Sequence, residues 1–141
     1  MSVDLQKNTT IDWDSLYEAA CTARDQSYSP YSRFKVGAAL LTAEGDVVVG
    51  CNVENRSYGL TICAERTALV QMVAGGQREV VAVAVVTETS PPATPCGMCR
   101  ESLTEFAGDI PVLTANLRGE RKIYRLRELH PSPFEWAGPP G

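Results

Sequence analysis

Apolar residues are distributed along the chain in two ways: at helical spacing in some segments, and in short apolar runs typical of strands in others. Within residues 11–28, apolar positions recur at helical spacing, which predicts a first helix. Asp12 or Asp14 can cap its start, and Pro30 forbids its continuation. Two β-branched, apolar runs then flank the turn sequence AEGD, which predicts a β-hairpin over residues 34–55.

The rest of the pattern predicts two further helices and three further strands. An apolar segment at residues 61–74 ends at a glycine pair, which is typical of a helix C-terminus. The segment at 80–87 is almost continuously apolar, which predicts a strand buried on both faces. The later elements are a helix over 96–108 and strands over 110–115 and 122–126.

This order of elements predicts an α/β domain, in which helices pack on a mixed sheet of about five strands. A length of 141 residues is typical of one domain, so residues 1–141 are expected to fold as a single unit. Residues 1–11 are polar and are expected to be loose. The proline-rich tail at 130–141 is expected to wrap the surface.

Charge and composition reduce the number of functional classes to which the protein could belong. The formal net charge is −4, and basic residues are scattered except in residues 118–127, which we interpret as a solvated strand. Nucleic-acid-binding surfaces concentrate positive charge, so a small neutral ligand is favoured over a polynucleotide. No apolar run is long enough to span a membrane and the first residues lack a signal-peptide core, so a cytoplasmic location is expected.

The five cysteines do not indicate a disulfide framework, because their number is odd and the chain is expected to be cytosolic. His130 is the only histidine, so a multi-histidine metal site is excluded. Cys96 and Cys99 are spaced i, i+3 at a predicted helix start, where both thiols share a face and the thiolate form is favoured. Alone, this pair is compatible with a redox motif, half of a structural zinc site or two core thiols.

Cys63 starts another predicted helix, 33 residues before Cys96 and with one strand between them. Helices that follow neighbouring parallel strands start at one edge of a sheet, so three thiolates are expected to meet there. Three protein ligands and an open position are typical of a catalytic zinc site, whereas a structural site usually has four. Cys51 remains a candidate for a fourth ligand.

Glu65 lies in the first turn of the same helix and points about 200° away from Cys63. We therefore predict that it does not bind the metal but reaches across the site as a proton shuttle. Three thiolates and Zn²⁺ sum to a net charge of −1, so a compensating cation is expected. We predict that Arg66 donates a hydrogen bond to a thiolate. Arg100 is a weaker candidate, and a surface charge is the alternative for both.

The pattern C-x-E followed by P-C-x-x-C is the three-cysteine form of the zinc deaminase signature. Matching segments are PYSRFKVGAALL, GCNVEN, TICAERTAL, PCGMCRESLTEF and, more weakly, ELHPSPF. Through these segments the chain closely resembles the small, homotetrameric cytidine deaminases over residues 14–134. The resemblance implies their three-layer α/β fold, one zinc ion per subunit, and sites at the boundaries between subunits.

The resemblance also implies roles for individual residues. Cys63, Cys96 and Cys99 would bind zinc, and Glu65 would move protons between water and the base. The implied substrate contacts are Asn52 and Glu54 for ribose hydroxyls, Phe34 for the pyrimidine, the backbone at Ala64 for the departing amino group, Tyr58 at the subunit boundary, and Phe134 in a neighbouring subunit's site.

The implied activity is hydrolytic deamination of cytidine and 2′-deoxycytidine in pyrimidine salvage. Asn52 and Glu54 are spaced i, i+2 on a predicted strand and so share a face, and the carboxylate would repel a 5′-phosphate. The alternatives are a deaminase of a modified nucleoside such as blasticidin S, a non-catalytic zinc-binding module, and a polynucleotide-editing deaminase. Arg56 and His130 depart from the family pattern, the latter close to Phe134.

Overall fold

The computed structural model describes residues 10–139, which form four α-helices, one 3₁₀ turn and five strands. The predicted loose segment at 1–11 lies almost wholly outside the described residues. In chain order the elements are α2 (Trp13–Arg24), β1 (Gly37–Thr42), β2 (Val47–Cys51), η1 (Tyr58–Leu60), α3 (Ala64–Ala74), β3 (Val80–Thr87), α4 (Gly97–Phe106), β4 (Pro111–Asn116), β5 (Arg121–Arg125) and α5 (Leu126–Leu129).

The five strands form one mixed sheet in the order β2-β1-β3-β4-β5, which confirms the predicted architecture. All neighbouring pairs are antiparallel except β3 and β4, which run parallel. Because β2 and β3 are both antiparallel to β1, they run in the same direction and end at the same edge. The helices α3 and α4 follow these two strands and begin at that edge. The expectation that the two strands are neighbours is wrong, since β1 lies between them.

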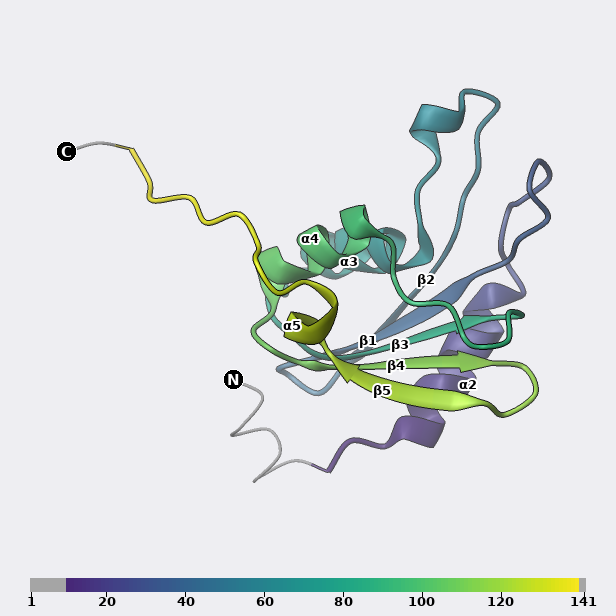
Figure 1. Cartoon of the computed structure of the whole chain (residues 1–141), viewed down its shortest axis with the longest axis horizontal. Coiled ribbons are helices and arrows are strands. Elements are labelled where there is room, and N and C mark those ends of the chain that lie inside the picture. The colour runs from purple at the N-terminus through teal and green to yellow at the C-terminus, as the bar shows by residue number, and fades with distance from the viewer. Residues whose placement is uncertain (1–9, 140–141) are drawn as a thin grey trace.

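The molecule has three layers, with α2 on one face of the sheet and α3 and α4 on the other (Figure 1). Alternating strand residues supply two separate apolar cores, and β3 contributes to both, as its continuous apolar sequence predicts. The core beneath α3 and α4 includes Leu40, Leu69, Met72, Val83, Leu103 and Val112. The core beneath α2 includes Leu16, Ala20, Ala39, Ala84 and Leu113.

Two glycines allow the backbone of a helix to pack directly against the backbone of a strand. A Cβ atom at Gly50 of β2 would lie 2.5 Å from the carbonyl oxygen of Ala64 and 2.5 Å from the nitrogen of Ala68. A Cβ atom at Gly37 of β1 would lie 2.0 Å from the carbonyl oxygen of Ala20. A side chain at either position would have to displace the helix. Gly50 therefore fixes how closely the start of α3 packs on the sheet.

Several element boundaries differ from the predictions. The first helix occupies less of 11–28 than predicted, and its cap is Asp12, whose side chain accepts a backbone N–H. α3 begins at Ala64 because Ile62 is still extended and pairs with Val53 in a β-bridge. Neither η1 nor α5 was predicted, since one turn is too short to show an apolar period.

The C-terminal segment extends away from the body of the molecule instead of wrapping the surface (Figure 1). Its aromatic residues Phe134 and Trp136 are each 75% exposed. The charged strand β5 is exposed over its first three residues, as predicted for a solvated edge. Over the described part of the chain, no helix combines the length and hydrophobicity needed to cross a bilayer.

Candidate active site

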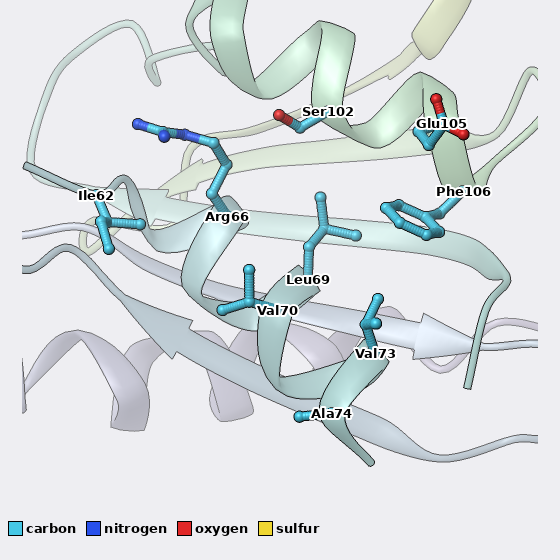
Figure 2. A pocket seen from close by; sticks show the side chains of 9 residues that line it. All are labelled: Ile62, Arg66, Leu69, Val70, Val73, Ala74, Ser102, Glu105 and Phe106. Atoms are coloured by element: carbon cyan, nitrogen blue, oxygen red, sulfur yellow. The ribbon is translucent and has the colours of Figure 1, made fainter. Parts of the chain in front are cut away.

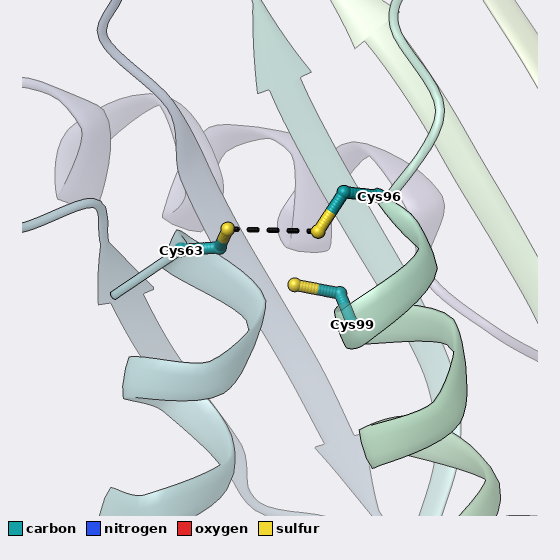
Figure 3. A group of neighbouring side chains, drawn as sticks. All are labelled: Cys63, Cys96 and Cys99. Carbon is teal, nitrogen blue, oxygen red and sulfur yellow. Dashed lines mark hydrogen bonds between the residues drawn. The ribbon is translucent and has the colours of Figure 1, made fainter. Parts of the chain in front are cut away.

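Two helix starts bring three thiols together at the common edge of the sheet (Figure 3). Cys63 and Cys96 immediately precede α3 and α4, and their carbonyl oxygens accept the first helical N–H groups. Cys99 follows in the first turn of α4 and is fully buried. The three sulfur atoms lie within 4.8 Å of one another, and the Sγ atoms of Cys63 and Cys96 are 3.7 Å apart.

This set of donors fits a zinc ion. Tetrahedral Zn–S bonds of about 2.3 Å would place sulfur atoms about 3.8 Å apart, close to the observed separation. Three thiols leave a fourth coordination position open, which is typical of a catalytic site. Within residues 10–139 no other group of three potential ligands is found, and Cys51, the candidate fourth ligand, is not part of the cluster.

Hydrogen bonds within the cluster favour a thiolate at Cys63. The hydrogen bond from Cys99 is the main cause that lowers the pKa of Cys63 to about 5, and Arg66 lowers it further. The pKa of Cys99 is raised, mainly by this same hydrogen bond and also by burial. Nη2 of Arg66 lies 3.7 Å from the Sγ atom of Cys63. This is the contact predicted for a cation that compensates the thiolates.

Glu65 is the second residue of α3 and is only 3% exposed. Its side chain lines the same cavity as Cys63 and Cys96. Burial is the main cause that raises the pKa of Glu65 to about 7, and the charge on Cys63 raises it as well. A carboxyl group with a pKa near neutrality can both accept and donate a proton. Glu65 is therefore suited to proton transfer beside the thiol cluster.

A cavity of about 250 Å³ connects the thiols with the loop before β1. Six residues singled out in the sequence line it: Phe34, Asn52, Glu54, Cys63, Glu65 and Cys96. They come from the loop before β1, the segment after β2, and the starts of α3 and α4. The volume suits a small molecule, in agreement with the class of ligand expected from the charge.

Asn52 holds the loop that carries Phe34. Asn52 was predicted to lie in a strand, but β2 ends at Cys51. The chain nevertheless continues into a β-bridge at Val53. The side chain of Asn52 is largely buried, and its Nδ2 donates to the carbonyl oxygen of Phe34 at 2.7 Å. Its Oδ1 accepts from the backbone nitrogen of Val36 at 2.9 Å.

Glu54 holds the same loop from a second point. Its Oε1 accepts the N–H groups of Tyr31 and Ser32 at 2.9 and 3.1 Å, and its Oε2 accepts the hydroxyl of Ser32. These hydrogen bonds, above all the one from the Ser32 hydroxyl, lower the pKa of Glu54. The carboxylate is therefore charged at neutral pH and faces the cavity.

Three of the implied substrate contacts are not part of this cavity. Ala64 is the first residue of α3 and is fully buried. Tyr58 is 74% exposed and borders an adjoining depression, where its ring meets that of Tyr31 edge-on with centroids 5.9 Å apart. Phe134 lies on the extended tail. Within one subunit these residues do not complete the site, and their roles stay predictions.

Arg100 does not approach the thiols as its candidate role requires. Its Nε donates to the carbonyl oxygen of Pro95 at 2.7 Å, and its Nη2 donates to Oγ1 of Thr94 at 2.9 Å. Its Nη1 donates to the carbonyl oxygen of Leu129 at 2.6 Å. Arg100 therefore braces the loop that precedes Cys96 and joins it to the end of α5.

The two departures from the family pattern lie outside the cavity. Nε2 of His130 is 2.7 Å from Oε1 of Glu101, which ties the beginning of the tail to α4. Arg56 is exposed in the segment between β2 and η1.

The cavity also contains polar residues that the sequence did not single out. Ser32 lines the cavity and lies two residues before Phe34, within the matched segment PYSRF. Its position next to Phe34 in that segment could have identified it as a site residue. Thr94 lines it directly before the P-C-x-x-C motif. No spacing rule distinguishes Thr94 from the other residues of its proline-rich loop.

Comparison with known proteins agrees with this arrangement. The chain matches the family model "Cytidine and deoxycytidylate deaminase zinc-binding region" over residues 11–114. It is 48% identical over 125 residues to the cytidine deaminase of Halalkalibacterium halodurans, covering 88% of this chain and 95% of that protein. The crystal structure of cytidine deaminase from Burkholderia pseudomallei matches with a TM-score of 0.85 and 46% identity, covering 88% of this chain and 100% of that one.

A more distant relative carries a different substrate in its name. The chain is 32% identical over 108 residues to the blasticidin-S deaminase of Bacillus cereus, covering 71% of this chain and 76% of that protein. The solved relatives confirm the predicted three-layer fold.

Proposed function

The chain belongs to the cytidine and deoxycytidylate deaminase zinc-binding family, and from this premise we propose that it hydrolyses cytidine and 2′-deoxycytidine to uridine and 2′-deoxyuridine with release of ammonia. One observation carries the proposal: the buried carboxyl of Glu65 and the thiol cluster share a cavity with Phe34, Asn52 and Glu54. We place the reaction in pyrimidine salvage in the cytoplasm.

Zinc, when bound by the three thiolates, supplies an activated water as the nucleophile. Glu65 would take a proton from the attacking water and deliver it to N3 of the pyrimidine, while the water oxygen forms a bond to C4. It then carries the second proton of that water to the amino group on C4, which leaves as ammonia while C4 becomes a carbonyl. The pKa of about 7 allows one carboxyl group to act in both directions. Arg66 offsets part of the thiolate charge at Cys63.

The hydrogen bonds of the cavity leave one acceptor and one donor for the sugar. Oε1 of Glu54 already accepts two N–H groups and Oε2 accepts one hydroxyl, so Oε2 has room for one further donor. Oδ1 of Asn52 already accepts two donors, and Nδ2 has one N–H left beyond its bond to Phe34.

A single hydroxyl group can satisfy both remaining positions, because it donates once and also accepts. Cytidine and 2′-deoxycytidine share every hydroxyl except the one at C2′, so this inventory supports both as substrates. The charge on Glu54 also favours a nucleoside over a nucleotide, since a 5′-phosphate nearby would be repelled.

We propose a homotetramer, with sites at the subunit boundaries, as the working form. A groove of about 640 Å³ lies between α3 and α4. Its walls include Leu69, Val70, Val73 and Phe106 (Figure 2). Val70 is 62% exposed. An exposed apolar surface of this kind is typical of protein association, which supports burial of the groove between copies of the chain.

The exposure of two aromatic residues also supports assembly. Tyr58 and Phe134 are 74% and 75% exposed, so a neighbouring subunit is needed for either to be buried at a site. Light scattering after size exclusion should give a mass four times the 15.3 kDa of the chain. A monomer that deaminates cytidine at full rate would contradict this arrangement.

The activity is tested by measuring ammonia release from the zinc-loaded protein. Cytidine and 2′-deoxycytidine should both be deaminated, whereas cytosine, which has no sugar, and CMP, which carries a phosphate, should be poor substrates. Release from blasticidin S alone would favour the alternative of a modified-nucleoside deaminase. Glu65→Gln protein provides the control for contaminating activity.

A further inference from the structure

Ser32 links Glu54, which is expected to contact the sugar, with Phe34, which is expected to contact the pyrimidine. Its hydroxyl donates to Oε2 of Glu54 and accepts the backbone N–H of Phe34 at 3.0 Å. A serine hydroxyl has one hydrogen to donate, so this pair of contacts fixes its orientation. The backbone N–H of Ser32 also donates to Oε1 of Glu54, at 3.1 Å. Ser32 is thus attached to the carboxylate by two atoms and to Phe34 by one.

The peptide of Phe34 is held on both sides. Ser32 fixes its N–H, and Nδ2 of Asn52 fixes its carbonyl oxygen at 2.7 Å. The next carbonyl, that of Lys35, accepts from Nε of the buried Arg24 at 3.1 Å. Phe34 as a whole is 40% exposed, so its ring is not enclosed by core packing and these backbone contacts set where the loop presents it.

We propose that Ser32 is a positioning residue that couples the carboxylate of Glu54 to the ring of Phe34. The inference rests on the proposed function, in which the sugar contacts Glu54 and the pyrimidine packs on Phe34. Oε2 of Glu54 accepts the Ser32 hydroxyl and is also the atom with room for a sugar hydroxyl. A sugar that orders Glu54 therefore also orders the loop that presents the ring to the base.

The test compares Ser32→Ala with Ser29→Ala. Ser29 belongs to the same loop, but its hydroxyl lies 3.1 Å from that of Ser27 and contacts neither Glu54 nor Phe34, so it controls for general loosening. Ser32→Ala should raise KM for cytidine about tenfold with a smaller change in kcat, the scale of one hydrogen bond to a charged group. Ser29→Ala should stay within about twofold of the parent, and Ser32→Thr should recover most of the loss.

Coupling to Phe34 is measured in a second background. The rise in KM caused by Ser32→Ala should be at least about threefold smaller in a Phe34→Leu protein, because the ring that Ser32 positions is gone. If the rise in KM is the same in both backgrounds, Ser32 acts through Glu54 alone and the proposal is overturned. An equal loss in Ser29→Ala, or no loss in Ser32→Ala, would also overturn it.

Amide hydrogen exchange separates this inference from the proposed function. The N–H of Phe34 should exchange about tenfold faster in Ser32→Ala than in the parent or in Ser29→Ala, whether or not cytidine is a substrate. Unchanged exchange would show that Ser32 does not hold the Phe34 backbone. Failure of the parent protein to deaminate cytidine would reject the proposed function and leave the exchange result interpretable.

Discussion

The two ends of the cavity are built by different means. At the thiol end, Cys63, Glu65 and Cys96 belong to helix starts that pack against an apolar core, and Glu65 is 3% exposed. At the other end, which the proposed function assigns to the sugar and which we call the sugar end, Phe34 is 40% exposed on a loop that side-chain hydrogen bonds hold in place. The groups to which we assign the chemistry are thus positioned by core packing, and the ring to which we assign recognition of the base is positioned by polar contacts.

This difference implies that substitutions at the two ends fail in different ways. Loss of a group at the thiol end should remove metal or the chemical step, with little change in substrate affinity where the metal stays. Loss of a group at the sugar end should weaken substrate binding and leave the zinc content intact.

The largest effect is expected for Cys96→Ala. Two thiols cannot hold zinc as three do, so the bound metal should fall from about one ion per subunit to nearly none. Ammonia release should be lost and the melting temperature should fall, as metal analysis and calorimetry would show. Cys51→Ala, outside the cluster, should keep its zinc. A stable, zinc-loaded Cys96→Ala protein would remove Cys96 from the ligand set.

Glu65→Gln should separate the chemical step from metal binding. The amide is nearly isosteric but cannot take up a proton, so kcat should fall by roughly 10²–10⁴ while zinc is retained. Steady-state kinetics and metal analysis measure the two quantities on the same preparation. Glu18→Gln, an exposed position on α2, should change neither. Substantial turnover by Glu65→Gln would reject the proton-shuttle role.

Glu54→Gln addresses the sugar end. Oε1 accepts two N–H groups in the parent, and a neutral amide replaces these charge-assisted bonds with weaker ones. The ratio kcat/KM for cytidine should fall roughly 10- to 100-fold, mainly through KM, with zinc unchanged. A fall confined to kcat would place Glu54 in the chemical step and erase the contrast between the two ends.

Gly50→Ala tests whether backbone packing positions the thiol end. The added Cβ would lie 2.5 Å from the carbonyl oxygen of Ala64, so α3 must shift. We expect a loss of about 1–3 kcal/mol in the free energy of unfolding, measured with urea. Gly108→Ala adds its Cβ in open space and should change stability by less than about 0.5 kcal/mol. Equal results for the two would disprove the close-packing argument.

The smallest effect concerns pH. The pKa of Glu54 is lowered in the folded protein from an ordinary value of 4.5, chiefly by the Ser32 hydroxyl. Its ionised form therefore contributes stability above about pH 4.5, and this contribution is lost as the pH falls through the lowered pKa. The melting-temperature difference between the parent and Glu54→Gln should narrow on going from pH 7 to pH 3. A constant difference would contradict the shift.

The sequence predicted correctly those elements and contacts that follow from a local pattern with a strong physical cause. Helical spacing predicted the three long helices, because burial of one face imposes that period. Short apolar, β-branched runs bounded by turn residues predicted the five strands. The C-x-x-C spacing placed two thiols at one helix start, since positions i and i+3 share a face. The sequence did not predict that Arg100 braces the loop before Cys96, because such tertiary contacts have no periodic signal. It also did not predict that the tail extends away from the body of the molecule.

The chemical inventory could be read from local sequence patterns: three thiols and a carboxylate at two helix starts, and aromatic and polar residues near the hairpin. Which of these groups meet depends on the packing of the whole domain. β2 and β3 end at one edge although β1 separates them, and Gly50 allows α3 to approach the sheet. The role of Ser32 depends on a contact across 22 residues of chain. Such distances are set by the packing of whole layers, which no local pattern encodes.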